Sequence, residues 1–398
     1  MSLLDDVSIV VTPNGYKAGE LYAVIPSNGD ADMDVTRATD ATRVDENGLI
    51  EDVLSNVPRI DYTGGGCPHI LAEPQRTNLL PYSEAFGSWH TVNNVTITQD
   101  TTETTSPSGT NNASKILVSS ASTPRRLFEV ISTSSGSDYT FTLYAKKGTT
   151  DFIRVYFSSS IIDISFDLTN GTKTVTAGTG SIESVGNDWY RIQGTGTSSL
   201  TTEVPQIQLS NSASVNDYLY IWGSQMEEGS YATSYIPTSG STVTRNQDLF
   251  TRDGIGSLIN STEGVLFVEW KPKLSSDYSF ISINNGSITD SVIIGKSNNT
   301  TNMFIAVRSS NVYQALYTSG VYDFTIFNKV AVKWKLNDIS IWINGTEATN
   351  WSSGSSPVGL SKLSFDFGNG TENFYGKVKQ LQVYKAALTD VQLAALTS

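Results

Sequence analysis

The sequence predicts an all-β protein with two antiparallel β-sandwiches (jelly rolls) in tandem, preceded by an N-terminal anchoring segment and ending in one short helix. Two observations favour this fold class. Apolar and polar residues alternate over short runs, which is the pattern of strands with one buried face. Asn-Gly pairs recur, and both residues tolerate the positive φ that two-residue hairpin turns require. Alternating runs lie at 141–144, 151–157, 265–270, 330–334 and 339–343, and Asn-Gly pairs at 170–171, 285–286, 344–345 and 369–370.

One hairpin and one helix are the clearest single elements. The hairpin joins the run 339–343, through Asn344-Gly345, to a return strand that runs towards Ala348. The helix is expected at the C-terminus, where Thr389 and Gln392 form a capping-box pattern just ahead of apolar residues. Helical periodicity is nearly confined to this end of the chain.

The chain divides into four parts by composition and periodicity, because 398 residues are too many for a single hydrophobic core. Residues 1–35 form a strand-rich N-terminal segment. Residues 36–80 are rich in Arg, Asp, Gly and Pro and are interpreted as an ordered connector. Residues 81–246 form the first sandwich. Residues 247–398 form the second, which begins after the turn-rich stretch 237–241.

Composition argues against several kinds of partner. The net charge of −13 and the pI near 4.6 disfavour nucleic acid, since phosphate binding needs a basic stripe, and they disfavour an anionic membrane surface. No apolar run reaches the roughly 18 residues of a membrane span, and the N-terminus has no secretion-signal pattern. Cys67 is the single cysteine, which rules out an intrachain disulfide, and it is interpreted as a loop residue without a role.

The predicted connector carries a group of motifs that occur together. They are 38–51 (ATDATRVDENGLIE), 58–62 (PRIDY), 71–80 (LAEPQRTNLL) and 82–84 (YSE). This group resembles the segment that precedes carbohydrate-binding-module-like jelly rolls in phage tail and structural proteins. The resemblance resumes at 220–229 (YIWGSQMEEG) and 231–238 (YATSYIPT), so that its two ends bracket residues 36–245.

The last third of the chain resembles concanavalin A-like lectin/glucanase domains of the laminin-G type. The supporting residues lie at 264–270, 333–334, 341–345, 374–378 and 381–390. Together the two resemblances imply a bacteriophage virion protein, such as a tail fibre, head fibre or decoration protein. They imply other virion proteins as partners, bound through the N-terminal segment, and a homo-oligomer, with a trimer as one form. The missing secretion signal agrees with release by lysis inside a virion.

The acidic residues do not form a catalytic pattern. A retaining glycosidase needs two carboxyl groups about 5 to 5.5 Å apart, which on one strand means acids two or four residues apart. Glu269 stands alone on its predicted strand, while Glu227 and Glu228 are adjacent and would face opposite sides. We therefore predict that the protein is not an enzyme and has no catalytic residues.

Aromatic side chains are the candidate binding residues, because sugar rings stack on exposed Trp and Tyr. Core packing is the alternative for each of them, and it is expected to hold for Trp270, Trp334 and Trp342, which lie in alternating strands. Trp351 lies in a polar stretch and is the leading candidate. The predicted carbohydrate-binding residues are Trp351, Tyr313, Tyr375, Trp89 and Tyr156.

The resemblance to jelly rolls also implies a structural calcium ion, with Glu84 and Asp217 as ligands and carbonyl oxygens completing the shell. No other cofactor is predicted. The leading functional hypothesis is adhesion to host-surface glycans by a virion protein. The alternatives are a purely architectural virion component and a polysaccharide-degrading tail enzyme.

Overall fold

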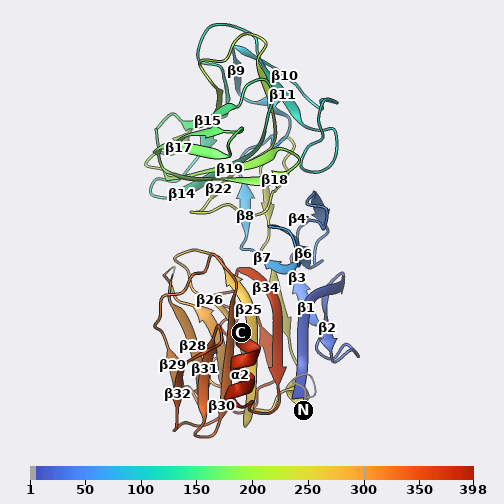
Figure 1. The fold of residues 1–398 in the computed structure, drawn as a ribbon, viewed down its shortest axis with the longest axis vertical. Helices are drawn as coiled ribbons and strands as arrows, with labels where there is room; N and C mark the ends of the chain where they lie inside the picture. The colour runs from blue at the N-terminus through green and yellow to red at the C-terminus, as the bar shows by residue number, and fades with distance from the viewer. Residues whose placement is uncertain (1–5, 300) are drawn as a thin grey trace. The chain divides into compact units, whose positions relative to one another are not determined.

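The computed structural model describes residues 6–299 and 301–398 (Figure 1). Strands run through the whole of this part, and the helix α2 (Asp390–Thr397) lies at the C-terminus. The capping box is present, since Gln392 N donates to Thr389 Oγ1 and Thr389 N donates to Gln392 Oε1. The predicted all-β class with a short C-terminal helix is confirmed. No helix in the described part of the chain is long and apolar enough to cross a membrane.

The chain folds into two compact units that are interleaved in sequence rather than strictly consecutive. Unit 1 comprises Met1–Asp40, Val53–Pro74 and Asn246–Ser398, and unit 2 comprises Ala41–Asp52 and Gln75–Arg245. The segment predicted as a connector, residues 36–80, is therefore divided between the two units. Its hairpin of β4 (Ala41–Val44) and β5 (Ile50–Val53) lies largely in unit 2, while β6 (Arg59–Asp61) and β7 (His69–Ala72) belong to unit 1.

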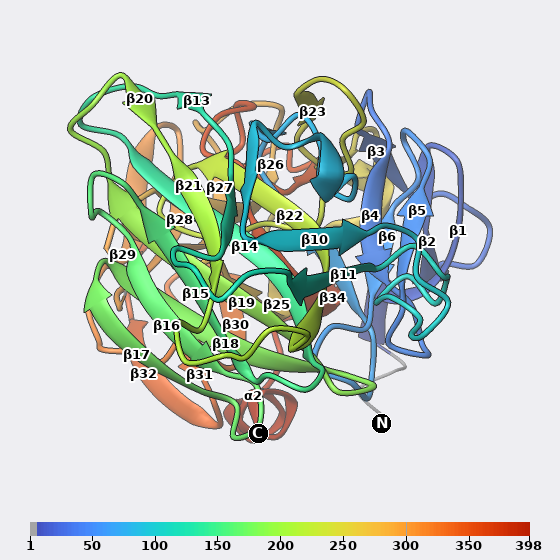
Figure 2. The same cartoon turned by 90° about the horizontal axis from the view of Figure 1, so that it is seen from above.

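Unit 2, all of whose residues are described, is a sandwich of two six-stranded antiparallel sheets (Figures 1 and 2). Sheet I has the order β10 (Val95–Thr98), β11 (Ser114–Val118), β22 (Tyr218–Glu228), β14 (Asp138–Lys147), β19 (Trp189–Thr197) and β18 (Thr179–Gly186). Sheet II has the order β17 (Thr172–Ala177), β16 (Asp163–Asp167), β15 (Phe152–Phe157), β21 (Pro205–Leu209), β12 (Arg126–Phe128) and β9 (Thr91–Asn93). One apolar core fills the space between them.

The described part of unit 1 is built around one continuous antiparallel sheet that folds back on itself, so that β27 faces β25 and β30 across a single core. Trp270 and Trp334 lie in this core, and Trp342 packs on the outer face of the sheet beneath α2, so all three are buried as predicted. The strand order is β29 (Val312–Tyr317), β28 (Met303–Ser309), β27 (Ser291–Lys296), β26 (Ser279–Asn284), β33 (Lys362–Ser364), β24 (Leu249–Arg252), β3 (Met33–Thr36), β2 (Glu20–Ile25), β1 (Val7–Lys17), β34 (Gly376–Tyr384), β25 (Glu263–Pro272), β30 (Asn328–Lys335), β31 (Ile339–Ile343) and β32 (Thr346–Trp351), with β7 joined to β34.

The N-terminal strand lies inside this sheet. Strand β1 pairs with β2 on one side and with β34 on the other, and both pairings are antiparallel. The N-terminal segment was predicted to anchor the protein to other virion proteins, and a short N-terminal strand commonly does so by adding to a partner's sheet. Because both edges of β1 are already paired over part of their length, the structure gives this mode of anchoring no free strand edge there.

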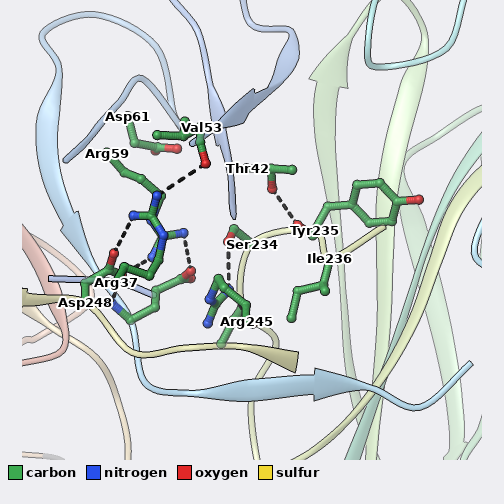
Figure 3. Close-up of polar contacts among 12 residues, drawn as sticks. Arg37, Thr42, Val53, Arg59, Asp61, Ser234, Tyr235, Ile236, Arg245 and Asp248 are labelled. Carbon is green, nitrogen blue, oxygen red and sulfur yellow. Dashed lines mark hydrogen bonds and ion pairs between the residues drawn. The ribbon is translucent and has the colours of Figure 1, made fainter. Parts of the chain in front are cut away.

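A buried network of charged residues ties the connector motifs of unit 1 together (Figure 3). The carboxylate of Asp248 accepts hydrogen bonds from Arg37, at 2.9 Å, and from Arg59. Arg37 also donates to the carbonyls of Leu54 (2.6 Å) and Val57 (3.0 Å). The side chains of the two arginines and of Asp248 have no exposed surface. Buried charges need ion-pair and hydrogen-bond partners. The recognised motif 58–62 therefore contains a residue, Arg59, that stabilises the fold.

Candidate functional site

The outer face of sheet II carries two rows of polar and aromatic side chains that cross neighbouring strands. Alternate residues of a strand point to the same side, so both rows face away from the core residues Leu127, Ile207 and Val155, which are fully buried. One row contains Arg126, Gln208, Arg154 and Ser165, and the other contains Phe128, Gln206, Tyr156 and Asp163.

Hydrogen bonds join the polar members of the two rows into a ladder. Asp163 accepts two hydrogen bonds from Arg154, both of 2.6 Å, and this pairing raises the pKa of the Arg154 guanidinium. Arg154 Nη1 donates to Gln208 Oε1 at 3.2 Å, and Gln208 Nε2 donates to Gln206 Oε1 at 2.8 Å. Arg126 Nη1 donates to the same Gln206 oxygen at 2.8 Å. The ladder fixes the side chains before any ligand arrives.

Two half-buried aromatic rings flank the ladder. The Arg154 guanidinium lies 4.5 Å from the ring centre of Tyr156, and the Arg126 guanidinium lies 5.1 Å from the ring centre of Phe128. The two rings stand on β15 and β12, with Gln206 of β21 between them. Two strand spacings separate them, which is roughly 10 Å. The face therefore offers two partly open apolar platforms. Gln206 between them is only 1% exposed, so the accessible polar groups are those of Arg126, Arg154 and Gln208.

The outer face of sheet I is different, because most of its aromatic residues are covered. Tyr144, Trp189 and Trp222 are all buried there and form a separate apolar cluster. Trp189 Nε1 donates to the carbonyl of Thr105 at 2.9 Å, which places the segment around Thr105 against the edge of the ring. These three rings thus pack against the fold. Tyr156 and Phe128 of sheet II remain partly open to solvent, as does Tyr218 of sheet I.

Tyr156 is the predicted binding residue that the structure places on this face. Its neighbours Arg126, Phe128, Gln206 and Gln208 were not predicted. Their strands show a usable signal, since polar or aromatic residues alternate with buried aliphatic ones in 126–128 and 205–209. Strand alternation alone does not reveal that β12 and β15 both neighbour β21, and the site depends on that order.

Two of the other predicted aromatic residues lie inside or against a core. Trp89 is 4% exposed, packs against Phe86, and donates from Nε1 to the carbonyl of Tyr82 at 2.9 Å, so it offers no platform. Trp351 was expected in a polar loop, but it ends strand β32, pairs with Ile339 and packs half-buried against the core of unit 1. The backbone pairing of β32 draws its ring towards the core.

The remaining two predicted aromatic residues lie in unit 1. Tyr375 is half-buried, and its hydroxyl donates to Gln247 Oε1 at 2.7 Å. Tyr313 is 42% exposed on β29, with the Arg308 guanidinium 4.7 Å from its ring centre. The predicted aromatic residues therefore do not form one site, and Tyr313 is the most accessible of those outside sheet II.

The two predicted calcium ligands have different surroundings. Glu84 accepts hydrogen bonds from Tyr235 at 2.8 Å and from Asn112 at 2.9 Å, and burial raises the pKa of its carboxyl group. Asp217 accepts a hydrogen bond from the backbone of Ser214 at 2.7 Å. Within residues 6–299 and 301–398, no three His, Cys, Asp or Glu side chains are grouped to hold a metal ion. Calcium binding stays a prediction.

Comparisons with known proteins found solved structures that are similar to parts of this structure, but no match to its sequence. No family model matches the sequence, and no curated protein matches it. Among solved structures, a CBM40 domain of a Ruminococcus gnavus IT-sialidase is 18% identical with a TM-score of 0.30, and the match covers 35% of this chain and 84% of that one. Domain 4 of AbnA, an extracellular arabinanase from Geobacillus stearothermophilus in complex with arabinotriose, is 16% identical with a TM-score of 0.31 and coverages of 43% and 84%. A heptameric SAP-like pentraxin from Limulus polyphemus is 15% identical with a TM-score of 0.29 and coverages of 35% and 70%.

Proposed function

We propose that this chain is a non-enzymatic glycan-binding protein and that the outer face of sheet II is its binding site. The observation that carries the proposal is the pair of half-open rings, Tyr156 and Phe128, on either side of the hydrogen-bonded ladder. Sugar rings present apolar C–H faces that stack on aromatic rings and hydroxyl groups that pair with fixed amides and guanidinium groups. A ladder that is already ordered lowers the entropy lost on binding.

The arrangement of carboxylates supports binding rather than hydrolysis. Asp163 is the acidic residue within the two rows, and both of its oxygens are held by Arg154. A glycosidase needs a second carboxyl group across the scissile bond, and one of the two must be able to donate a proton. The two rows contain no second carboxyl group beside that of Asp163.

We infer that the protein is a structural component of a bacteriophage virion, either a fibre or a decoration protein, with its lectin-like modules at the virion surface for host adhesion. The inference depends on the motifs within residues 36–245 and on the laminin-G-like pattern of residues 247–398. In this setting its partners are other virion proteins and host-surface glycans, and the chain assembles as a homo-oligomer. Detection of the protein in purified virions by mass spectrometry tests this setting, and its absence there would contradict it.

Tyr156→Ala and Phe128→Ala are each expected to weaken glycan binding about tenfold, because each removes a central aromatic contact worth roughly 1.4 kcal/mol. A glycan array identifies a bound sugar, and calorimetric titration with that sugar then measures the dissociation constants. Tyr313→Ala is the control, since this tyrosine is also solvent-accessible, at 42% exposed, but lies in unit 1.

The outcomes separate the candidate functions. Unchanged affinity in both sheet II variants, with loss in Tyr313→Ala, would move the site to unit 1 and contradict the proposal. An array without any bound glycan would favour the purely architectural role. Shortening of the bound polysaccharide during incubation would favour the enzyme.

A further inference from the structure

A second feature of the molecule, in unit 1, has the form of a cation site. Lys296 ends strand β27, and its side chain has no exposed surface. Its ammonium group is surrounded by four backbone carbonyl oxygens. They belong to Ser275 at 2.8 Å, Asp277 at 2.6 Å, Ser297 at 2.9 Å and Asn299 at 3.2 Å. An ammonium has three protons, so at least one of them is shared between two of the four oxygens. We call the four oxygens the carbonyl cage.

The partners of Lys296 differ from those of an ordinary buried lysine. Lysine is seldom fully buried unless it is paired with a carboxylate. Lys333 follows this rule, since it is 6% exposed and its ammonium lies 2.7 Å from a carboxylate oxygen of Asp338. Lys296 forms no ion pair with any residue that the structure describes. Burial lowers its pKa to about 8, and the charge of Asp277 opposes that shift, so the amine is mainly charged at neutral pH.

The geometry of the carbonyl cage suits a large monovalent cation. Backbone carbonyl oxygens can replace the hydration shell of potassium, as they do in potassium-selective channels. Calcium prefers oxygens at about 2.3 to 2.6 Å and six to eight of them, several from carboxylates. The four distances to Lys296 Nζ lie between 2.6 and 3.2 Å, and all four oxygens are uncharged carbonyls.

We propose that the carbonyl cage is a monovalent-cation site and that Lys296 fills it with the chain's own ammonium group. The tethered ammonium then does what a bound ion would do, because it joins the loop before β26 to the turn after β27. That loop leads directly into Tyr278, which is 38% exposed and stacks on Phe280 at 5.7 Å. Unit 1 holds this exposed ring in place without taking up an ion from solution.

Chemical rescue tests the proposal. Lys296→Ala empties the carbonyl cage and is expected to lower the melting temperature of unit 1 by several degrees, as loss of a buried, fully hydrogen-bonded group does. Ammonium chloride or potassium chloride is expected to restore most of that loss. Tetramethylammonium chloride at equal ionic strength is the salt control, because its cation is too large for the cage. The wild-type protein is expected to respond equally to all three salts.

Two further variants make the result decisive. Lys296→Met fills the space with an apolar chain of similar length, so it is expected to be destabilised without rescue. Lys333→Ala removes a buried lysine whose partner is a carboxylate, and no selective rescue by ammonium or potassium is expected there. Equal responses of Lys296→Ala to ammonium and tetramethylammonium, or rescue by calcium alone, would overturn the proposal. If Lys296→Ala is unfolded at room temperature, its circular dichroism is followed during titration with ammonium chloride. Recovery of the folded spectrum supports the proposal, and no recovery contradicts it.

Discussion

Replacing Asp248 by asparagine is expected to lower the free energy of unfolding of unit 1 by about 3 to 5 kcal/mol. The carboxylate is fully buried and is the shared partner of Arg37 and Arg59, which are fully buried too (Figure 3). The amide removes the negative charge but leaves both guanidinium groups in the interior. Arg59 keeps an ion pair with Glu73 at 2.7 Å, and Arg37 keeps its hydrogen bonds to the carbonyls of Thr39, Leu54 and Val57. Breaking a buried charge network from one side is costly because the remaining charge has no water to replace its partner.

Denaturant titration followed by tryptophan fluorescence and circular dichroism measures this loss as a shift of the unit 1 transition. Asp253→Asn is the matched control. Asp253 is exposed and lies 3.4 Å from Lys362, so its replacement is expected to change stability by less than about 1 kcal/mol. If Asp248→Asn proves as stable as this control, the network is not what holds the connector motifs of unit 1 together.

Local pattern was enough to predict the strands, one hairpin and the terminal helix. The hairpin of β31 and β32 turns at Asn344 and Gly345, whose φ angles are 49° and 83°. Both values are positive, as the predicted turn type requires. These elements depend on residues that are close in sequence, and sequence periodicity reports such contacts directly.

The division of the chain into units depends on contacts between residues far apart in sequence, and the sequence pattern did not reveal it. Asp248 meets Arg37 across 211 residues and Arg59 across 189. Nothing in the spacing of an arginine indicates which distant carboxylate it will pair with. The connector was therefore recognised as a group of motifs and interpreted as a link, although its parts belong to different units.

The same limit explains the partial prediction of the site on sheet II. Tyr156 was found because exposed Trp and Tyr side chains were the candidate binding residues. Gln206 and Arg126 lie beside it only because β21 pairs with both β15 and β12. Trp89 was another candidate that the sequence offered, but it is only 4% exposed. Its ring packs in the core of unit 2, which the local sequence pattern did not indicate.

Asn78→Ala is expected to destabilise unit 2 by about 3 to 5 kcal/mol, because it leaves several buried backbone groups without partners. Asn78 is fully buried. Its amide nitrogen donates to the carbonyls of Ser224 (3.2 Å) and Ile236 (2.9 Å), and its oxygen accepts from the amides of Leu80 (3.1 Å) and Met226 (3.1 Å). Each buried group that loses its partner costs roughly 1 to 3 kcal/mol. Hydrogen bonds to this side chain join the two ends of the group of motifs recognised in residues 36–245. The motifs at both ends therefore have a structural role.

The decisive comparison is between Asn78→Ala and Asn78→Asp, with the exposed Asn211→Ala as a control expected to change stability by less than about 0.5 kcal/mol. The aspartate keeps the oxygen that Leu80 and Met226 need. Its second oxygen, however, would face the carbonyls of Ser224 and Ile236, where a donor is required. We therefore expect Asn78→Asp to be at least as unstable as Asn78→Ala at neutral pH, measured as the midpoint of the unit 2 unfolding transition. A stable aspartate variant would mean that the two donated hydrogen bonds contribute little, and the meeting of the motif ends would then depend on apolar packing instead.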